Sequence, residues 1–213
     1  GHLTKEDGKV YSGTFENGKL EGSGSITVDE KLYYSGDFSD NVPEGSGKQY
    51  YPSGEVRYSG AFSNGVPHGM AMEYTENGTV KYNGMFTQGL YNGEGVLYTD
   101  NGMKLYSGSF EMGRYSGTGT AYNESGKLYS GEFENGLYNG TGTLYGSDGS
   151  IITGSFTDGK ISGKAVCTYI NGMRYEGCFD EGIPDGEGAL TNVTGSFKYS
   201  GMFDDGDFDY SRL

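Results

Sequence analysis

The chain has 213 residues, a net charge of −14 and 41 glycines, together with 20 tyrosines, 11 phenylalanines and no tryptophan. The acidic balance argues against nucleic acid as a partner and against docking on anionic lipid by charge alone, because both surfaces repel acidic groups. No apolar run reaches the roughly 18 residues of a membrane-spanning helix. The glycines do not recur at every third position, which excludes collagen.

A motif of the form Y-x-G-x-F-x-x-G-x-x-x-G-x-G recurs nine times along the chain, at intervals of 23 or 24 residues. Periods of this length are typical of repeat arrays, in which each unit packs only on its neighbours. We therefore expect a single array over residues 1–213. The repeats begin at Tyr11, Tyr34, Tyr58, Tyr82, Tyr106, Tyr129, Ile152, Tyr175 and Tyr199.

Each repeat predicts one β-hairpin, and Asn135-Gly136 illustrates its turn, because both residue types tolerate a positive φ. The register that follows from this turn pairs Phe133 with Tyr138, Gly131 with Gly140 and Tyr129 with Gly142. The residues opposite the motif phenylalanine are then Leu20, Pro43, Pro67, Tyr91, Tyr115, Tyr138, Ile161 and Pro184. All are apolar or aromatic, which supports the register. A proline here has no N–H to donate, so pairing with the neighbouring strand is expected to stop there.

A second, variable connection follows each G-x-G step. Glu124-Ser125-Gly126 and Ser147-Asp148-Gly149 suit three-residue loops that end in a left-handed glycine. These loops pair Ala121 with Tyr129 and Leu144 with Ile152. In the 24-residue repeats we expect a four-residue loop, such as Asp100 to Met103. In the first repeat Lys31 stands at the position of the loop glycine.

The motif aromatics are expected to form the core. One row across the sheet reads Tyr11, Gly24, Gly36, Gly45, Phe62, so bare glycines are bracketed by rings that can cover them. We predict a ribbon of rings over a glycine floor, in which no repeat folds alone. This ribbon comprises Tyr11, Phe15, Tyr34, Phe38, Tyr58, Phe62, Tyr82, Phe86, Tyr106, Phe110, Tyr129, Phe133, Tyr175 and Phe179.

These units resemble MORN repeats (membrane occupation and recognition nexus) over residues 8–210. The resemblance implies an all-β fold, an elongated and twisted antiparallel sheet of about nine tandem β-hairpins. It also implies scaffolding, dimerisation or targeting roles. The departures from the motif are Asn41 for the turn glycine, Ala71 and Ala165 for the second G-x-G glycine, and Ile152 for tyrosine. The last hairpin, Tyr199 to Tyr210, lacks the G-x-G glycines and is expected to be a cap or a truncation.

One stripe breaks the small and polar character of the opposite face. Tyrosines stand at the same position of five successive repeats and are candidates for partner binding, with some of their cross-strand neighbours. The alternative is that these pairs only stabilise strand ends. The candidate partner-binding residues are Tyr50, Tyr74, Tyr98, Tyr122, Tyr145, Leu105, Leu128 and Ile151; the cross-strand neighbours expected for the five tyrosines are Arg57, Lys81, Leu105, Leu128 and Ile151.

The acidic residues beside the phenylalanines and turns are expected to form a solvated rim, with a cation site or a surface for a basic partner as the alternatives. They are Glu111, Glu132, Glu134, Asp158, Asp180, Glu181, Asp204, Asp205, Asp207 and Asp209. The segment from Asp204 to Asp209 resembles a calcium loop only superficially, because it lacks the glutamate and the helices of an EF-hand.

Other reactive residues point to no reaction centre. The G-x-G steps open no helix, so they are not phosphate loops. His68 is placed in a hairpin turn without a ligand or catalytic partner in a recognisable motif. Cys167 is expected on the ring side and Cys178 on the polar side, which disfavours a disulfide. We therefore expect no catalytic residue, no metal and no cofactor.

The sequence as a whole favours a non-enzymatic interaction or scaffolding module. It would bind a protein or peptide along the sheet, or self-associate as a homodimer or end to end. The alternatives are a membrane-peripheral lipid-binding module, which the charge disfavours, and a carbohydrate-binding module in which exposed tyrosines stack on sugars.

Overall fold

The structure is a computed structural model that describes residues 1–195 and 198–208. It contains two compact units, Gly1–Arg114 and Tyr115–Leu213. The predicted fold class is confirmed, because both units consist of antiparallel strands joined in hairpins, and the described residues contain no helix. Accordingly, no helix in this part of the chain is long and apolar enough to span a membrane.

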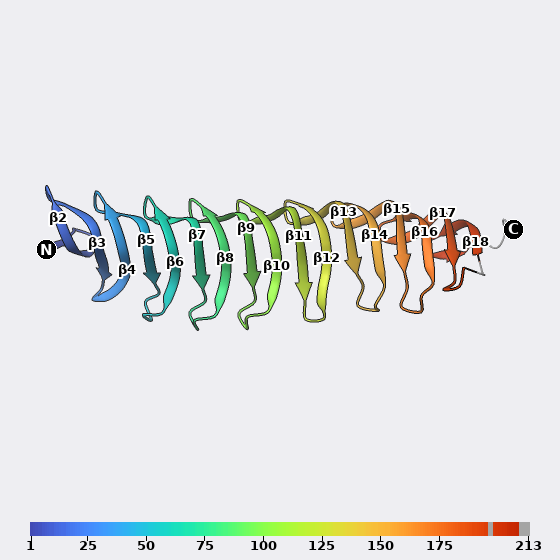
Figure 1. Ribbon diagram of the computed structural model, residues 1–213, viewed down its shortest axis with the longest axis horizontal. Coiled ribbons are helices and arrows are strands. Elements are labelled where there is room, and N and C mark those ends of the chain that lie inside the picture. Colours follow the sequence, from blue (N-terminus) through green and yellow to red (C-terminus); the bar gives the residue numbers. More distant parts are fainter. Residues whose placement is uncertain (196–197, 209–213) are drawn as a thin grey trace. The chain divides into compact units, whose positions relative to one another are not determined.

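The strands follow one another along the chain, as Figure 1 shows. Unit 1 comprises β1 (His2–Thr4), β2 (Val10–Glu16), β3 (Lys19–Val28), β4 (Lys31–Ser39), β5 (Val42–Tyr50), β6 (Val56–Ser63), β7 (Val66–Tyr74), β8 (Val80–Thr87), β9 (Leu90–Tyr98) and β10 (Lys104–Glu111). Unit 2 comprises β11 (Arg114–Asn123), β12 (Gly126–Glu134), β13 (Leu137–Tyr145), β14 (Ile151–Thr157), β15 (Lys160–Thr168), β16 (Arg174–Asp180), β17 (Ile183–Thr191), β18 (Lys198–Asp204) and β19 (Asp207–Phe208).

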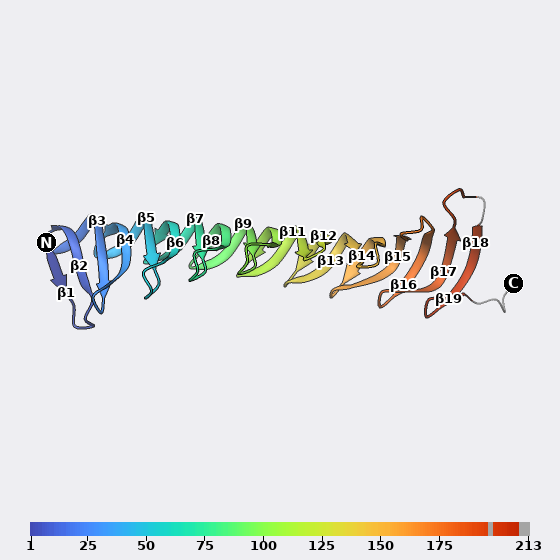
Figure 2. The same cartoon turned by 90° about the horizontal axis from the view of Figure 1, so that it is seen from below.

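Within each unit every strand pairs with the next to form an open antiparallel sheet. Strand β1 precedes the first motif, and the repeat does not predict it; it lies along β2, with His2 opposite Ser12 (Figure 2). In the last hairpin Phe203 lies opposite Phe208. The predicted endpoint of that hairpin, Tyr210, falls outside the described residues, as does Asp209.

The predicted two-residue turn is confirmed. Asn135 and Gly136 have φ angles of 52° and 88°, and Phe133 lies opposite Tyr138. Asn41, which replaces the turn glycine, keeps the geometry with a φ of 69°. The same register gives the pairs Phe15–Leu20, Phe38–Pro43, Phe62–Pro67, Phe86–Tyr91, Phe156–Ile161 and Phe179–Pro184.

Beyond the phenylalanine the predicted register is wrong. Gly131 lies opposite Gly142 rather than Gly140, and Tyr129 lies opposite Leu144 rather than Gly142. The outgoing strand bulges by two residues between Tyr138 and Gly142, where Gly140 adopts a φ of 64°. Glycine suits this left-handed conformation because it has no Cβ. The first glycine of G-x-G is therefore a bulge residue.

The bulge aligns glycines across strands in one row. The predicted row that joined Tyr11 to Gly24 is wrong in this respect, because Gly13 lies opposite Gly24 and Tyr11 opposite Ile26. From there the row continues through Gly36, Gly47, Gly60, Ala71, Gly84, Gly95 and Gly108 in unit 1. In unit 2 it comprises Gly119, Gly131, Gly142, Gly154, Ala165, Gly177, Gly188 and Gly201.

The aromatic ribbon forms the core of each unit. Every predicted member is buried except Phe15, which is half-buried. A Cβ added at Gly47 would overlap the ring of Tyr34, so the floor must be glycine where a tyrosine lies on it. The hydroxyl of Tyr34 donates to the carbonyl of Asp37 over 3.2 Å. The ladder skips Asp37 at the bulge, so the tyrosine provides its carbonyl with a partner.

The same bond recurs from Tyr82 to Met85, Tyr106 to Ser109, Tyr129 to Glu132 and Tyr175 to Cys178. The two alanines of the row occur where this tyrosine arrangement changes. Ala165 accompanies Ile152, which has no hydroxyl. Ala71 accompanies Tyr58, which interacts with Glu73 and Arg57. The motif departures are therefore coupled to one another.

Most of the hairpin turns also bond to the preceding repeat. The N–H of Gly65 donates to the carbonyl of Pro43 over 3.0 Å, and the N–H of Asn41 donates to Leu20 over 3.1 Å. The ladder between β5 and β6 begins at Gly45 and Phe62, so the prediction that strand pairing stops at Pro43 is confirmed. These bonds give the repeats a second contact beside the strand ladder.

The variable connections differ from the prediction. Ser147-Asp148-Gly149 is a three-residue loop as expected, with Gly149 donating to Gly146 over 3.0 Å. Glu124-Ser125 is instead a two-residue turn, because Asn123 lies opposite Gly126. The pairs Ala121–Tyr129 and Leu144–Ile152 are confirmed.

The predicted four-residue loop from Asp100 to Met103 is wrong. Thr99 and Met103 are bonded over 2.8 Å, so this loop also has three residues. The additional residue lies in a bulge of the outgoing strand, where Leu97 pairs with Tyr106 and Tyr98 with Lys104. In this repeat the additional residue therefore lies in a strand bulge rather than in a longer loop.

Candidate functional site

The tyrosine stripe is only half exposed. Tyr50, Tyr74, Tyr98, Tyr122 and Tyr145 all have intermediate burial. The hydroxyl of Tyr50 lies 3.1 Å from Ser35 Oγ, and that of Tyr74 lies 3.3 Å from Met72 Sδ. Leu105 and Leu128 are half-buried and Ile151 is 42% exposed. Binding by these residues stays a prediction.

Most cross-strand partners predicted for the stripe are wrong. Tyr145 lies opposite Ile151 as expected. The partners of the other four tyrosines shift by one residue: Tyr50 lies opposite Val56, Tyr74 opposite Val80, Tyr98 opposite Lys104 and Tyr122 opposite Lys127. The physical reason is the bulge in each outgoing strand. It leaves Arg57, Lys81, Leu105 and Leu128 as additional residues without a place in the ladder.

The bulge residues Arg57 and Lys81 reach groups on the ring side instead of the polar side. Lys81 Nζ lies 3.1 Å from Glu73 Oε1. The guanidinium of Arg57 lies 5.1 Å from the ring centroid of Tyr58 and 5.7 Å from that of Tyr51. Tyr33 occupies the same kind of bulge, and its hydroxyl accepts from Gln49 Nε2 over 2.5 Å.

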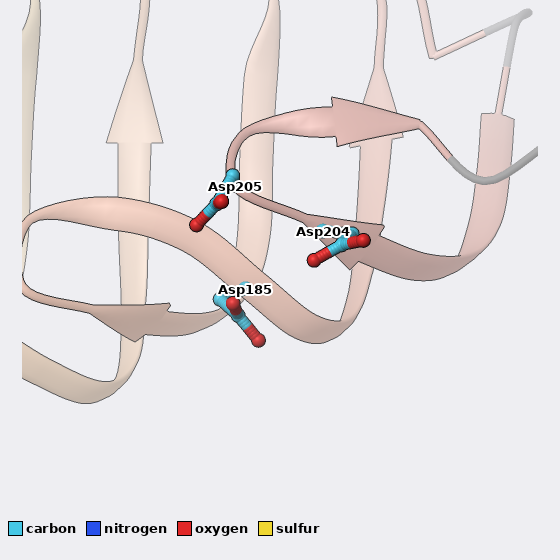
Figure 3. Close-up of side chains that lie close together, drawn as sticks. All are labelled: Asp185, Asp204 and Asp205. Carbon is cyan, nitrogen blue, oxygen red and sulfur yellow. The ribbon is translucent and has the colours of Figure 1, made fainter.

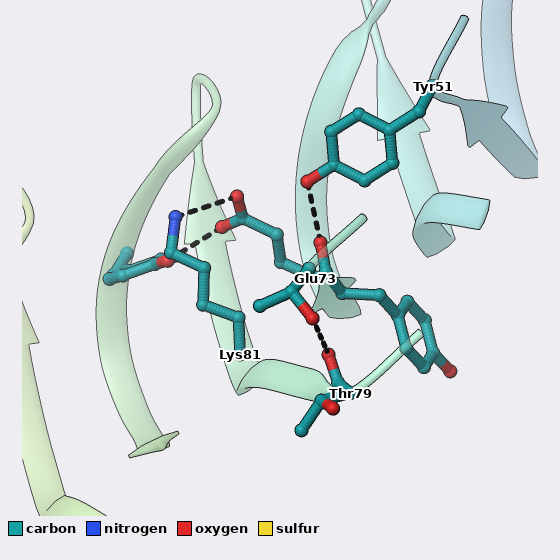
Figure 4. A network of polar contacts seen from close by, with 7 residues as sticks. Tyr51, Glu73, Thr79 and Lys81 are labelled. Atoms are coloured by element: carbon teal, nitrogen blue, oxygen red, sulfur yellow. Dashed lines mark hydrogen bonds and ion pairs between the residues drawn. The ribbon is translucent and has the colours of Figure 1, made fainter. Parts of the chain in front are cut away.

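A buried carboxylate lies among the rings of unit 1 (Figure 4). Glu73 is buried where other repeats have Ile26, Leu97 or Leu144, and it accepts a 2.6 Å hydrogen bond from the hydroxyl of Tyr91. Burial, the bond to Glu73 and its charge together raise the pKa of Tyr91 above its ordinary range. Figure 4 also shows the neighbouring hydroxyl of Tyr51, which donates to the carbonyl of Tyr74 over 2.7 Å.

Burial also raises the pKa of the core tyrosines. The pKa of Tyr58 rises to about 12, chiefly because burial disfavours the tyrosinate, with a smaller contribution from Glu73. For Tyr34, Tyr82, Tyr129 and Tyr175 the pKa also rises to about 12 for the same principal reason. These hydroxyls therefore stay protonated donors at neutral pH and do not act as bases.

The Glu73 network predicts unequal effects for its two charged members. Lys81→Met leaves the buried Glu73 carboxylate without its cation, and we expect a loss of about 2 kcal/mol in the free energy of unfolding, reduced by the exposure of Lys81. Glu73→Leu restores the aliphatic residue of other repeats and leaves an exposed lysine, so we expect no loss or a small gain. Chemical denaturation of both variants checks this, and an equal loss in the two would contradict it.

A pocket of about 360 Å³ opens at the variable-loop edge of unit 1. We call it the loop-edge pocket. Its walls are Tyr33, Tyr50, Tyr51, Leu32, Val28 and Pro52, and its charged residues are Lys31, Arg57 and Asp29. It thus contains one residue of the predicted stripe, Tyr50, with aromatic and basic residues that the stripe did not include.

An apolar strip runs along β7 on the polar face. The polar-face residues of this strand include Val66, Met70, Met72 and Tyr74, and the exposed fractions are 39%, 59% and 37% for the first three. Met85 lies opposite Met70 on β8 and is 37% exposed. We call Met70, Met72 and Met85 the methionine patch. The corresponding positions on β3 are Lys19, Glu21, Ser23, Ser25 and Thr27.

Unit 2 has a larger hollow on its polar face, about 780 Å³, lined largely by small residues. Its charged residues are Lys164, Lys198, Glu176 and Glu187. Equal numbers of both signs give this hollow no preference for a charged ligand. It lies above the glycine row, where the absence of side chains leaves the sheet thin.

Several carboxylates of the predicted rim have structural partners. Glu132 accepts from the hydroxyl of Thr141 over 2.6 Å and from its N–H over 2.9 Å at the bulge, and these two bonds lower the pKa of its carboxyl. Glu134 accepts from the side-chain amide of Asn139 over 3.0 Å. Glu44, which is not among the predicted rim residues, accepts from the N–H of Asn64 over 2.9 Å at the next turn. These carboxylates give the bulges and turns acceptors, in addition to any role in solubility.

Asp185, Asp204 and Asp205 bring carboxylate oxygens within 4.8 Å of one another (Figure 3). Asp185 occupies the position at which Glu44 accepts from the next turn. The fold therefore accounts for an acid at this place, and exposed acidic groups need no ion.

The remaining reactive residues are dispersed. Cys167 is buried and pairs with Tyr175, whereas Cys178 is half-buried opposite Lys164, and both are free thiols as predicted. The placement of His68 in a turn is wrong, because it lies in β7 and is exposed. Among the described residues, no nucleophile, base and orienting group come together as a triad would require.

These observations define a protein of tandem β-hairpins that pack through a shared aromatic face. The family model described as MORN repeat matches eight segments: 11–27, 34–56, 58–80, 82–104, 106–127, 129–151, 153–174 and 175–197. The chain therefore belongs to the MORN repeat family. The ninth predicted repeat, at Tyr199, lies outside the matched segments. Comparison with curated proteins finds no match.

Proposed function

We propose that the protein is a non-enzymatic interaction module that binds a protein or peptide on the polar face of unit 1. The observation that carries this proposal is the methionine patch, which places exposed methionines at positions that β3 and β5 fill with serine or lysine. Exposed methionines adapt to different partner side chains because the thioether is flexible and polarizable. MORN repeats are a scaffold-type repeat class, which fits such a role.

The partner is expected to combine apolar anchors with basic residues. Glu44 on β5 and Glu94 on β9 lie on the polar face to either side of β7, and the chain has a net charge of −14. Apolar anchors would cover Met70 and Met72, while basic groups would meet the carboxylates. The acidic surface would meanwhile repel anionic membranes and nucleic acid.

Selection from a displayed random peptide library tests this proposal. We expect enrichment of peptides that contain both apolar and basic residues. The double variant Met70→Ser/Met72→Ser should weaken their binding about tenfold or more, as loss of a buried anchor does. Because these side chains are exposed, the variant should keep its stability.

A matched control is Met103→Ser/Met112→Ser, which removes two methionines that are 40% and 70% exposed elsewhere in unit 1. Equal loss in the control, or no selective enrichment, would refute the proposal. Binding to acidic vesicles or to a glycan array, unaffected by the patch variant, would instead favour the lipid or carbohydrate alternative.

A further inference from the structure

The loop-edge pocket contains an arginine whose charge no carboxylate neutralises. Among the ion pairs of the described residues none includes Arg57. The contrast with its counterparts is direct. Lys81, in the equivalent bulge, pairs with Glu73, and Arg174, which also precedes a motif tyrosine, pairs with Glu176 over 2.7 Å.

The position of Arg57 is set by the backbone and by two rings. The bulge between Gln49 and Tyr50 leaves Arg57 outside the ladder. Its guanidinium then lies against Tyr51 and Tyr58, within the distance of a cation–π contact. The guanidinium also interacts with the hydroxyl of Tyr58. Its remaining N–H groups can donate to an oxyanion, and a guanidinium held on aromatic rings loses little entropy when it binds one.

The pocket walls are fixed before any ligand binds. Tyr33 is bonded to Gln49 over 2.5 Å, and Tyr51 to the carbonyl of Tyr74 over 2.7 Å. Leu32 and Tyr33 are 40% and 39% exposed, so they offer apolar area to a ligand. Fixed aromatic walls reduce the ordering that binding requires.

We propose that the loop-edge pocket binds a carboxylate-bearing peptide group, with the carboxylate on Arg57 and an adjoining apolar side chain against Leu32, Tyr33 and Tyr51. A volume of about 360 Å³ suits one or two side chains rather than a folded surface. Lys31 and Arg57 together exceed Asp29 by one positive charge, which matches one carboxylate. The net charge of +1 in the pocket is smaller than the charge of a phosphate monoester, and the acidic chain would repel an anionic bilayer.

The loop-edge pocket contains no residue of the methionine patch. Binding of a carboxylate there does not depend on the proposed function. NMR titration of the full chain tests it with three probes. N-acetyl-phenylalanine supplies a terminal carboxylate beside a ring. N-acetyl-phenylalanyl-glutamic acid α-amide supplies a side-chain carboxylate, because only its main-chain carboxyl is capped. N-acetyl-phenylalanine amide has the ring without the charge.

We expect at least one carboxylate probe to shift the resonances of Tyr33 and Tyr51, and the better of the two identifies the source. The uncharged amide should bind about tenfold more weakly, as should the better probe to Arg57→Gln, since each loses one charge-assisted contact. The affinity of Arg57→Lys should lie between those of the wild type and Arg57→Gln, because lysine keeps the positive charge but cannot donate two parallel hydrogen bonds as a guanidinium does.

Arg174→Gln is the control, because it removes the same charge from the residue before the motif tyrosine of another repeat, where the strand has no bulge. It should leave binding unchanged, and Met70→Ser/Met72→Ser should do so as well. The proposal is overturned if neither carboxylate probe binds, if acid and amide bind equally, or if Arg57→Gln has no effect while its spectrum shows an intact fold. Arg57-dependent binding of phosphoinositide vesicles without binding of the carboxylate probes would also overturn it.

Discussion

Tyr82→Ala is expected to lower the free energy of unfolding by about 4 kcal/mol, the cost typical of removing a large buried aromatic side chain. Tyr82 is 0% exposed and stacks on Tyr91 at 3.8 Å between ring centroids. Its ring meets Phe86 and Phe110 edge to face, and its hydroxyl donates to Met85 over 3.0 Å. The substitution removes all of these contacts together and uncovers the floor at Gly95.

Urea denaturation followed by circular dichroism measures this loss, with hydrogen exchange to report how far it spreads along unit 1. Tyr98→Ala is the control, because it deletes the same side chain from the half-buried stripe, and it should cost about 1 kcal/mol. A comparable loss in both variants would mean that the ring ribbon is not the main source of stability.

Gly142→Ala is expected to cost about 3 kcal/mol, at the upper end for overpacking. A Cβ at Gly142 would overlap the hydroxyl and ring of Tyr129, and no positive φ contributes to the strain at this position. The ring cannot easily move, because it packs against Phe133, Tyr138 and Phe156.

Ile152 and Ala165 show how the chain itself accommodates a methyl group in the glycine row. We therefore expect Gly142→Ala to cost much less when Tyr129 is also replaced by isoleucine, although Tyr129→Ile is destabilising by itself. The coupling energy in this double-mutant cycle should be about 2 kcal/mol. Chemical denaturation of the four proteins gives it, and simple additivity of the two losses would show that ring and floor are independent.

The turns and the ring ribbon could be predicted because each leaves a local mark in the sequence. The pair Asn135-Gly136 indicates a two-residue hairpin turn, because both residue types tolerate the positive φ angles that this turn requires. The alternation around Phe133 and Tyr138 then sets one face. Burial of the aromatics follows from that face alone, and only Phe15 is less buried than expected.

The bulges could not be read from the same alternation. The bulge at Gly140 adds two residues, so every later side chain keeps its face and the pattern looks unbroken. Only the backbone conformation distinguishes Gly140 from Gly142, and a sequence shows both simply as glycine. The register was therefore correct beside the turn and wrong beyond it.

The candidate site was missed for a related reason. A one-residue bulge does change the side that a residue reaches, and it moved Arg57 and Lys81 away from their predicted tyrosine partners. For Arg57 and Lys81 the 24-residue spacing was one available signal, because these repeats have 24 residues rather than 23. Tyr33 and Leu128 occupy the same kind of bulge in 23-residue repeats, where the spacing gives no such signal. The methionine patch appeared only when burial separated Met70 and Met72 from the core residue Ala71.

The bulge residues at the loop edge are positions at which the side chain can vary between repeats, which makes them useful for engineering. Tyr33, Arg57, Lys81, Leu105 and Leu128 differ widely in chemistry, although each occupies the same place in an almost unchanging frame. New side chains at these positions would replace no glycine or ring of the motif, but at Lys81 they would also remove the cation beside Glu73. A library randomised there would sample ligand chemistries on one scaffold, much as hypervariable loops do on an antibody.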